Sequence, residues 1–482
     1  MVTDVPATDA PATGGAATEA RPEDRPGSHH QAQRPPGPPG EQVDQPEPVR
    51  QAGTEDAAEP PPTVLIRMAD AGDVYVSWRW THALSASGVS RVPKAAADGA
   101  LDALEAALPG AATPRLTAAL TSGAFSTYDS ELALAERLSR TFLPYGLAQQ
   151  LHELWTRGVR PLLRIQPSPR TARLPWELLA PDPGLRLLDI ADLGLLAPTS
   201  VTHAPGRAVS SWSATRRLPV VAVLDPRVPG FRADSALGSV LGRPSAQTPL
   251  ARQIAGYAQN GRLRPDAGGD PAAMFRRSDV DREWLSVTLR AGASRLLYVG
   301  HVTAAAPESG QSENAQLHLA CGADSVGFAP PIRAHRPLSA KDLLLGTHSL
   351  AQSPESGAAR WPVPSRVALI ACESGGDMRF GEALGLATAM VHGGAELVTT
   401  TRWALPTDLA FHRLAGAPSQ ARPLHDAVCA IDAAHEEHEA VRALNDWQRT
   451  RLDAWRTART VEHSPVLWGA FATIGATLSG LG

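Results

Sequence analysis

Cysteine is scarce in this sequence, and basic residues are not in surplus. Only three of the 482 residues are cysteines, Cys321, Cys372 and Cys429. They lack the CxxC spacing of zinc sites and the density of a disulfide framework, so we expect reduced thiols and no metal site. The formal net charge is −4. Without an excess of Lys and Arg, neither nucleic acid nor an anionic membrane is an expected partner.

Long apolar stretches are also missing. No segment reaches the roughly 18 consecutive apolar residues that a membrane span needs. The first residues, MVTDVPATDAP, lack the basic stretch followed by an apolar stretch that marks a secretory signal. No apolar strand is followed by GxGxxG or GxxxxGK[ST], which weighs against a nucleotide-binding α/β domain. We therefore expect a cytoplasmic protein that binds no cofactor.

Aromatic residues are absent from the first part of the chain. Residues 1–62 contain no Phe, Trp or Tyr and are crowded with Pro, Gly, Ala, Gln and acidic residues. Such a segment cannot bury enough apolar surface to offset the entropy lost on ordering. The composition predicts a disordered tail over 1–62.

Residues 63–210 combine strand and helix patterns. In 63–80, Val74, Val76, Trp78 and Trp80 alternate with polar residues after a short apolar run, which predicts two strands joined by an Ala-Gly-Asp turn. Helical periodicity follows over 97–158. This part is expected to form an N-terminal α+β half.

Residues 211–482 alternate buried strands with amphipathic helices. The four strongest strand patterns are PVVAVLD (219–225), RLLYVG (295–300), RVALIA (366–371) and AELVTTT (395–401). Near-continuous apolar strands separated by helices predict a parallel-rich sheet covered by helices on both faces. The fold class is therefore α/β, and the binding site of such a sheet lies beyond the carboxyl ends of its strands.

Two chemically active side chains follow these strands directly. His301 is the first residue after RLLYVG, and Cys372 is the first residue after RVALIA. A thiol becomes a good nucleophile when a nearby imidazole accepts its proton. The glycines after Cys372, in CESGGD, would let a substrate backbone approach and leave N–H groups free for an oxyanion. This pattern indicates acyl transfer to a thiol.

Simpler interpretations of the same residues stay open. A cysteine that closes an apolar strand is often a small buried hydrophobe, and a histidine there often caps a turn. Cys321 is a competing nucleophile, although it ends a predicted hairpin over 315–322 and lacks the glycine-rich turn. Cys429 lies in a predicted helix, where core packing is the expected role.

At these positions the sequence resembles the CHAT domain family of caspase-like cysteine peptidases, which is related to separase. The strand ending YVGHV matches the family's Gly-His motif, and IACESGG matches its Cys motif. Four flanking segments also match, in the right order: LPWELL (174–179), LSAKDLLL (338–345), RWALPTD (402–408) and HSPVLWGAFATIG (463–475). The resemblance covers roughly residues 140–482. It implies a caspase-like sheet in which 63–210 is the first half and 211–482 the catalytic half.

The resemblance implies a cysteine endopeptidase that cleaves a protein partner, with Cys372 as nucleophile and His301 as base. The backbone N–H groups of Val302 and Cys372 would hold the oxyanion. Val302 stands where the family has glycine, so a catalytically silent CHAT-like module that binds proteins is the alternative. A regulatory sensor protein is a further expected partner.

Three residues are candidates for the substrate cleft, namely Glu373, Trp403 and Asp408. Trp403 and Asp408 belong to the segment after the strand that follows the nucleophile, where a structural role is equally open. Glu373 and Asp408 could select a basic substrate residue, and apolar selection is open as well.

Overall fold

The computed structural model describes residues 60–110, 113–305, 310–347, 355–371 and 385–476. Residues 1–59, most of the predicted tail, lie outside this description. Glu59–Gly482 forms one compact unit, and all that follows concerns it. The predicted boundary between residues 210 and 211 stays a prediction.

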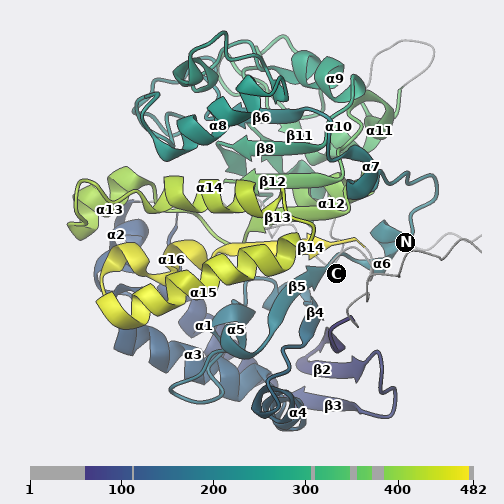
Figure 1. The fold of residues 1–482 in the computed structure, drawn as a ribbon, viewed down its shortest axis with the longest axis vertical. Helices are drawn as coiled ribbons and strands as arrows, with labels where there is room; N and C mark the ends of the chain where they lie inside the picture. The colour runs from purple at the N-terminus through teal and green to yellow at the C-terminus, as the bar shows by residue number, and fades with distance from the viewer. Residues whose placement is uncertain (1–59, 111–112, 306–309, 348–354, 372–384, 477–482) are drawn as a thin grey trace, which may run out of the picture. The chain divides into compact units, whose positions relative to one another are not determined.

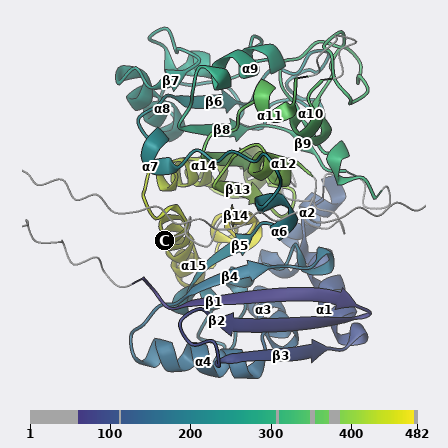
Figure 2. The ribbon, with the colours of Figure 1, turned by 90° about the vertical axis from the view of Figure 1, so that its right-hand side faces the viewer.

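An eleven-stranded sheet runs through the unit, in the order β3-β2-β1-β4-β5-β14-β13-β12-β8-β6-β7 (Figures 1 and 2). Its pairings are parallel except β1–β2, β2–β3 and β13–β14. The strands are β1 (Thr63–Ala71), β2 (Asp73–Trp80), β3 (Ser87–Val92), β4 (Leu162–Gln166), β5 (Asp192–Leu196), β6 (Val220–Leu224), β7 (Leu263–Arg264), β8 (Arg295–Val299), β12 (Arg366–Ile370), β13 (Leu397–Thr401) and β14 (Phe471–Gly475). The prediction of an α/β fold with a parallel-rich sheet is confirmed.

The four apolar runs of the second half form β6, β8, β12 and β13, and all four strands are buried along their whole length. Burial on both faces explains why these strands are continuously apolar instead of alternating. The hairpin of β1 and β2 is also confirmed, with Gly72 at the turn at a φ of 78°. A positive φ there suits glycine, which has no Cβ to clash.

Strand β14 is the last strand among the described residues, yet it lies in the middle of the sheet. It pairs in parallel with β5 and antiparallel with β13, through Ile474 with Leu195 and Val398 with Ile474. The sequence motif HSPVLWGAFATIG thus supplies the strand that joins the first five strands to the remaining ones.

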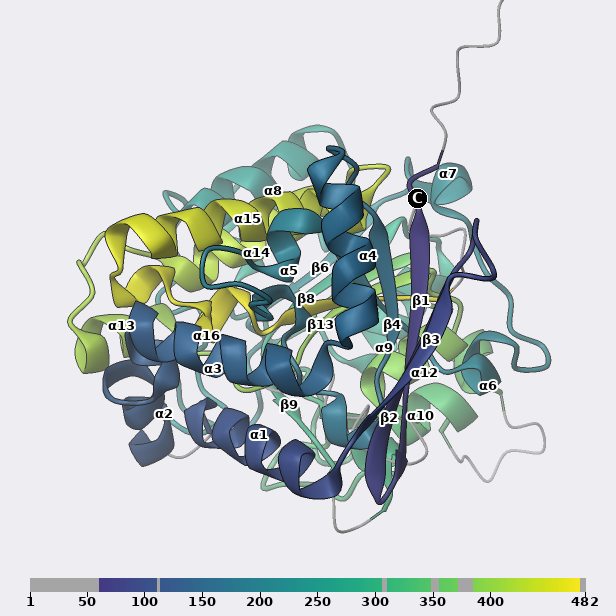
Figure 3. The same ribbon diagram turned by 90° about the horizontal axis from the view of Figure 1, so that it is seen from below.

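Helices cover both faces of the sheet (Figure 3). Helix α14 packs against both α8 and α15, and helix α12 packs against both α6 and α10. Helices α1 and α3 pack together beside the N-terminal strands. The helices of eight residues or more are α1 (Lys94–Ala107), α2 (Thr113–Thr121), α3 (Tyr128–Phe142), α4 (Tyr145–Thr156), α8 (Pro249–Gln259), α9 (Arg282–Arg290), α13 (Asp408–Ala415), α14 (Pro423–Ala434) and α15 (Ala440–Ala458). The shorter ones are α5 (Leu187–Ile190), α6 (Thr199–Thr202), α7 (Trp212–Thr215), α10 (Ala340–Leu345), α11 (Gly357–Arg360), α12 (Leu386–His392) and α16 (Pro465–Trp468).

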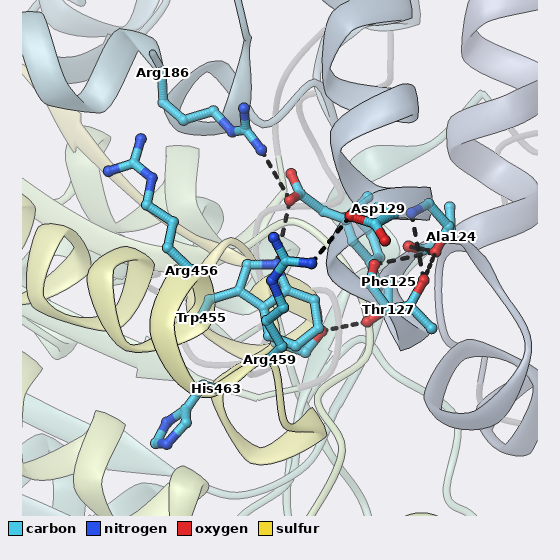
Figure 4. Close-up of polar contacts among 12 residues, drawn as sticks. Ala124, Phe125, Thr127, Asp129, Arg186, Trp455, Arg456, Arg459 and His463 are labelled. Atoms are coloured by element: carbon cyan, nitrogen blue, oxygen red, sulfur yellow. Dashed lines mark hydrogen bonds and ion pairs between the residues drawn. The ribbon is translucent and has the colours of Figure 1, made fainter. Parts of the chain in front are cut away.

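A polar contact fixes α15 to α3 (Figure 4). The carboxylate of Glu131 accepts hydrogen bonds from Arg186 at 3.1 Å and from the Trp455 indole at 3.2 Å. Arg459 pairs with Asp129 at 3.3 Å nearby. Burial raises the pKa of Glu131, and the Arg186 guanidinium opposes that rise. The buried carboxylate therefore links segments from both ends of the unit.

The predicted hairpin over 315–322 is wrong in its extent. Only Gln316–Leu317 forms a strand, β10, which pairs with β9 (Val302–Thr303) and β11 (Leu338–Ser339) in a small antiparallel sheet. Beyond it the chain turns away, and the Ala320 N–H donates to the carbonyl of Val280. Cys321 therefore does not end a hairpin strand.

Candidate active site

The carboxyl ends of β6, β8 and β12 lie side by side at one edge of the sheet. The register pairs Leu224 with Val299 and Val299 with Ile370, so the three strands end at one level. The residues that follow are Asp225 after β6 and His301 two positions after the end of β8. This edge is where an α/β sheet usually carries its binding site.

His301 is held by a backbone carbonyl. Its Nε2 lies 3.0 Å from the carbonyl oxygen of Gly238. A carbonyl can only accept, so Nε2 carries the hydrogen and Nδ1 is left as the proton acceptor. Burial lowers the pKa of His301, with the Gly238 carbonyl and the charge of Asp225 acting in the opposite direction. The imidazole is therefore neutral at neutral pH, as a general base must be.

Asp225 and Arg276 hold the Gly238 carbonyl in place. Arg276 donates to that carbonyl at 2.9 Å and pairs with Asp225 at 3.3 Å. Asp225 is buried and also accepts hydrogen bonds from the Ser239 hydroxyl at 2.6 Å and the Val240 N–H at 3.1 Å. The loop that contacts His301 is thus fastened to the end of β6.

The backbone beside His301 requires a glycine. A Cβ on Gly300 would lie 2.7 Å from the Tyr298 hydroxyl, closer than any side chain tolerates. That hydroxyl donates to the carbonyl of His301 at 2.7 Å and lies 2.9 Å from the carbonyl of His318. The glycine before the histidine therefore allows a buried tyrosine to fix the turn.

Val302 begins β9 and pairs with Leu317. Its side chain is buried in the main hydrophobic core, at 7% exposure. Hydrogen-bonded and non-hydrogen-bonded pairs alternate in an antiparallel ladder, and the N–H of His318 donates to the carbonyl of His301. The next pair, Val302 with Leu317, is therefore of the non-hydrogen-bonded kind, and the ladder does not use the Val302 N–H.

Two buried histidines that the sequence analysis missed lie beneath this turn. His318 Nε2 is 2.8 Å from the Thr303 hydroxyl, and its Nδ1 is 3.1 Å from Nε2 of His335. His335 Nδ1 lies 2.9 Å from the carbonyl of Cys321. Both side chains are fully buried. His318 lies in the segment predicted as a hairpin, but nothing in the sequence links it to His335, so only their contacts reveal the pair.

Cys372 and Glu373, the predicted nucleophile and one predicted cleft residue, lie outside the described residues. The last described residue before Cys372 is Ala371, which directly follows β12. The carbonyl of Ala371 accepts a hydrogen bond from the Thr401 hydroxyl on β13.

The two described cysteines are poor nucleophiles. Cys321 is fully buried, and burial raises the pKa of its thiol. Burial also raises the pKa of the Cys429 thiol, to about 12. Because the thiolate is the reactive form, neither residue is suited to attack a carbonyl at neutral pH.

Trp403 and Asp408 lie in the interior. Trp403 is fully buried, stacks on Phe125 at 5.9 Å between ring centroids, and donates its indole N–H to the carbonyl of Val466. Asp408, at the start of α13, bonds to Nδ1 of His425 at 2.5 Å. These contacts favour the structural alternative for both residues, and a role in the substrate cleft stays a prediction.

Within the residues that the structure describes, no three His, Cys, Asp or Glu side chains converge so that they could hold a metal ion. In the same part of the chain, none of the helices combines the length and the apolar character needed to cross a membrane.

The mostly parallel sheet with helices on both faces makes this an α/β protein, and His301 lies at the carboxyl edge of that sheet. The CHAT domain model matches residues 132–476, and the chain belongs to the CHAT domain family. The match includes the strands from β4 to β14 and the segment around His301.

Solved structures similar to this chain include two crystal structures of the Saccharomyces cerevisiae separase–securin complex, at 2.6 Å and 3.0 Å resolution. Each match has 9% sequence identity and a TM-score of 0.39, and covers 86% of this chain. The chain spans 30% of the separase chain that it matches. A search of curated protein sequences finds no match.

Proposed function

We propose that this chain is a cysteine endopeptidase that cleaves a protein partner, with Cys372 as nucleophile and His301 as general base. The observation that carries the proposal is the bond between His301 Nε2 and the Gly238 carbonyl, which leaves Nδ1 free to accept a proton. The register of β8 and β12 supports it, because their last paired residues, Val299 and Ile370, each precede the proposed catalytic residue by two positions.

The proposed reaction uses the thiol and the imidazole in turn. His301 takes the proton of the Cys372 thiol, and the thiolate attacks the carbonyl carbon of the scissile peptide bond. The tetrahedral intermediate collapses when His301 gives its proton to the leaving amine, which releases one fragment and leaves an acyl-enzyme. A water molecule, deprotonated by His301, then attacks the thioester, releases the second fragment and restores the thiol.

The oxyanion of this reaction needs donors that point at it. We assign this role to the backbone N–H groups of Val302 and Cys372. The ladder register supports the first assignment, because the pair formed by Val302 and Leu317 leaves that N–H unused by β10. The proposal also places the protein in the cytoplasm, where its thiols would stay reduced, and includes a sensor protein as regulator.

Alkylation rates test the proposed pair of residues. Iodoacetamide should label Cys372 at neutral pH at least about tenfold faster than Cys321 or Cys429, because a paired thiol has the larger thiolate fraction. His301→Ala should slow the labelling of Cys372 and abolish peptidase activity, whereas His203→Ala, at an exposed position, should change neither. Equal rates for all three thiols would contradict the proposal.

The second candidate is a catalytically silent CHAT-like module that binds proteins through the same edge. Val302 at the family's glycine position favours it. Cys372→Ala separates the two candidates, since loss of proteolysis with retained partner binding supports the peptidase. A wild type that binds a partner but cleaves nothing above the level of Cys372→Ala supports the silent module.

A further inference from the structure

A cavity of about 410 Å³ opens in the loop that follows β6. Residues 227–232 line it together with Ser278, and among them Arg227 and Arg232 are exposed. Phe231 supplies an aromatic wall. The cavity is therefore open to solvent, partly apolar and basic.

The loop around this cavity is a defined turn. The N–H of Phe231 donates to the carbonyl of Val228 at 3.2 Å, with Pro229 and Gly230 between them and a φ of 78° at Gly230. Proline followed by a residue with positive φ is the pattern of a type II turn. A Cβ on Gly230 would also lie 3.2 Å from that of Ala334, so the turn packs closely on the neighbouring segment.

The cavity is built by residues 227–232 and by Ser278, and the residues next to these two segments contact Gly300 and Gly238 beside His301. Pro226, just before Arg227, lies against Gly300, where an added Cβ would come within 3.2 Å of it. The N–H of Arg227 donates to the carbonyl of Arg277 at 2.9 Å. Arg276, which precedes Arg277 in the sequence, donates to the same Gly238 carbonyl that His301 contacts. The cavity thus lies at the edge of the sheet that carries His301.

The charges around the cavity do not cancel. Three ion pairs join arginines to aspartates near it: Arg276 with Asp225 at 3.3 Å, Arg277 with Asp279 at 2.5 Å, and Arg232 with Asp234 at 3.2 Å. Two further arginines, Arg227 and Arg333, have no carboxylate within ion-pair distance among the residues that the structure describes. The guanidinium of Arg333 lies 4.8 Å from the centre of the Phe231 ring. In a chain of net charge −4, this is a local excess of positive charge.

We propose that this cavity binds an acidic side chain of the peptide held in the proposed active-site cleft. A guanidinium matches a carboxylate in both charge and shape, so Arg227 would contact the carboxylate while the Phe231 ring packs against its methylene groups. The hydroxyl of Ser278 would donate a further hydrogen bond. The inference rests on the proposed function for its setting, and it assigns the substrate class: proteins with Asp or Glu near the cleaved bond.

This assignment differs from the selection of a basic residue that Glu373 or Asp408 could provide. Asp408 is buried and bonded to His425, so its carboxylate already has a partner inside the protein. The exposed charges that the structure describes around this cavity favour an anionic ligand.

Peptide digestion tests the inference. The full chain is incubated with a peptide library from a digested proteome, and cleavage sites are sequenced by mass spectrometry. Wild type should cleave peptides enriched in Asp and Glu on one side of the bond, and Arg227→Glu should lose that enrichment. Arg217→Glu makes the same charge change before β6, at the opposite edge of the sheet, and should keep it. Cleavage by wild type without acidic enrichment would overturn this inference and leave the proposed function intact.

A binding measurement tests the inference separately from cleavage. If wild type cleaves no more than His301→Ala does, the proposed peptidase activity is refuted, but the preference of the cavity for an acidic side chain is still decided by binding. The probes are a fluorescein-labelled eight-residue alanine peptide with one glutamate and its glutamine twin. Fluorescence anisotropy should show about tenfold tighter binding of the glutamate peptide, a preference that Arg227→Gln removes and Arg217→Glu retains. Equal binding of the two peptides would overturn the inference. The inference would also fail if a short oligonucleotide displaced the labelled glutamate peptide at a lower concentration than the unlabelled glutamate peptide does.

Discussion

Glu177 and Arg402, 225 residues apart in the sequence, form a buried ion pair. Arg402 Nη2 lies 2.9 Å from Glu177 Oε1, and both residues are less than 5% exposed. Arg402 also donates to the carbonyl of Gly469 at 3.0 Å. The segments LPWELL, RWALPTD and HSPVLWGAFATIG, which carry part of the resemblance to the CHAT family, therefore meet at one contact.

Breaking this pair should destabilise the protein. Glu177→Gln and Arg402→Met should each lower the free energy of unfolding by about 3–5 kcal/mol, because either change leaves a buried charge without its partner. The double variant should lose less than the sum, as measured by urea unfolding. Asp234→Asn, in an exposed pair with Arg232, should cost less than about 1 kcal/mol. Additive losses would show that the two side chains act independently.

Two tryptophans near this contact should be structural. Trp176 and Trp468 are 1% and 2% exposed, so replacing either by alanine leaves a large cavity. We expect a loss of about 3–5 kcal/mol in the free energy of unfolding for each. The control is Trp155→Ala, since Trp155 is 43% exposed and should cost much less. Wild-type stability in Trp176→Ala or Trp468→Ala would indicate a functional surface instead.

Asp225 should position His301 without touching substrate. Asp225→Asn removes the charge that favours protonated His301, so the pKa of His301 should fall and the pH profile of Cys372 alkylation should move with it. The labelling rate at neutral pH should also fall, because Arg276 and the Gly238 carbonyl lose their anchor.

Asp279→Asn is the matched control for this variant, since Asp279 pairs with the neighbouring Arg277 but has no contact with Gly238. It should leave the pH profile in place. A profile unchanged by Asp225→Asn, in a variant that folds, would show that Asp225 supports only the loop.

The buried histidine pair should make stability depend on pH. Burial lowers the pKa of His318 to about 3 and lowers that of His335 as well. The unfolded chain, with histidine pKa values near 6.5, therefore binds more protons than the folded chain below about pH 6.5. The contribution of the neutral histidines to the free energy of unfolding is therefore complete above that pH. It falls as the pH drops, by up to about 1.4 kcal/mol per pH unit for each histidine.

Urea unfolding between pH 7 and pH 5 measures this slope. His318→Gln should make the slope shallower, because glutamine does not titrate. His203→Gln, at an exposed position, should leave it unchanged. An unchanged slope in His318→Gln would mean that other groups cause the loss of stability in acid.

Val302→Gly restores the family residue but removes a buried side chain. We expect the free energy of unfolding to fall by about 2–3 kcal/mol, from lost burial and from the greater freedom of glycine in the unfolded chain. Peptidase activity per folded molecule should be unchanged or higher, since only the backbone beside the oxyanion site is relaxed. Lower specific activity in the folded variant would show that the valine side chain supports catalysis.

Much of the sheet could be predicted because its central strands are buried on both faces. Such strands are continuous apolar runs, and β6, β8, β12 and β13 were recognisable for that reason. The position of His301 followed directly from the end of β8.

The partners of His301 could not be predicted in the same way. Gly238 lies 63 residues earlier, in a loop without periodicity, and it contributes a backbone atom that every residue has. Asp225 directly follows β6 and pairs with Arg276, 51 positions later, and both residues adopt a positive φ that no sequence pattern indicates. Trp403 shows the same limit, since an aromatic residue after a strand fits a cleft or a core equally well until its neighbours are known.

The place of β14 has a consequence for synthesis of the protein on the ribosome. Strands β5 and β13 each lack their β14 partner until Phe471–Gly475 has emerged, so the sheet has two open edges for as long as translation of the preceding segment continues. Exposed strand edges pair readily with other chains. The nascent polypeptide is therefore expected to need protection by chaperones until β14 has emerged, and to acquire its continuous eleven-stranded sheet only after that strand inserts.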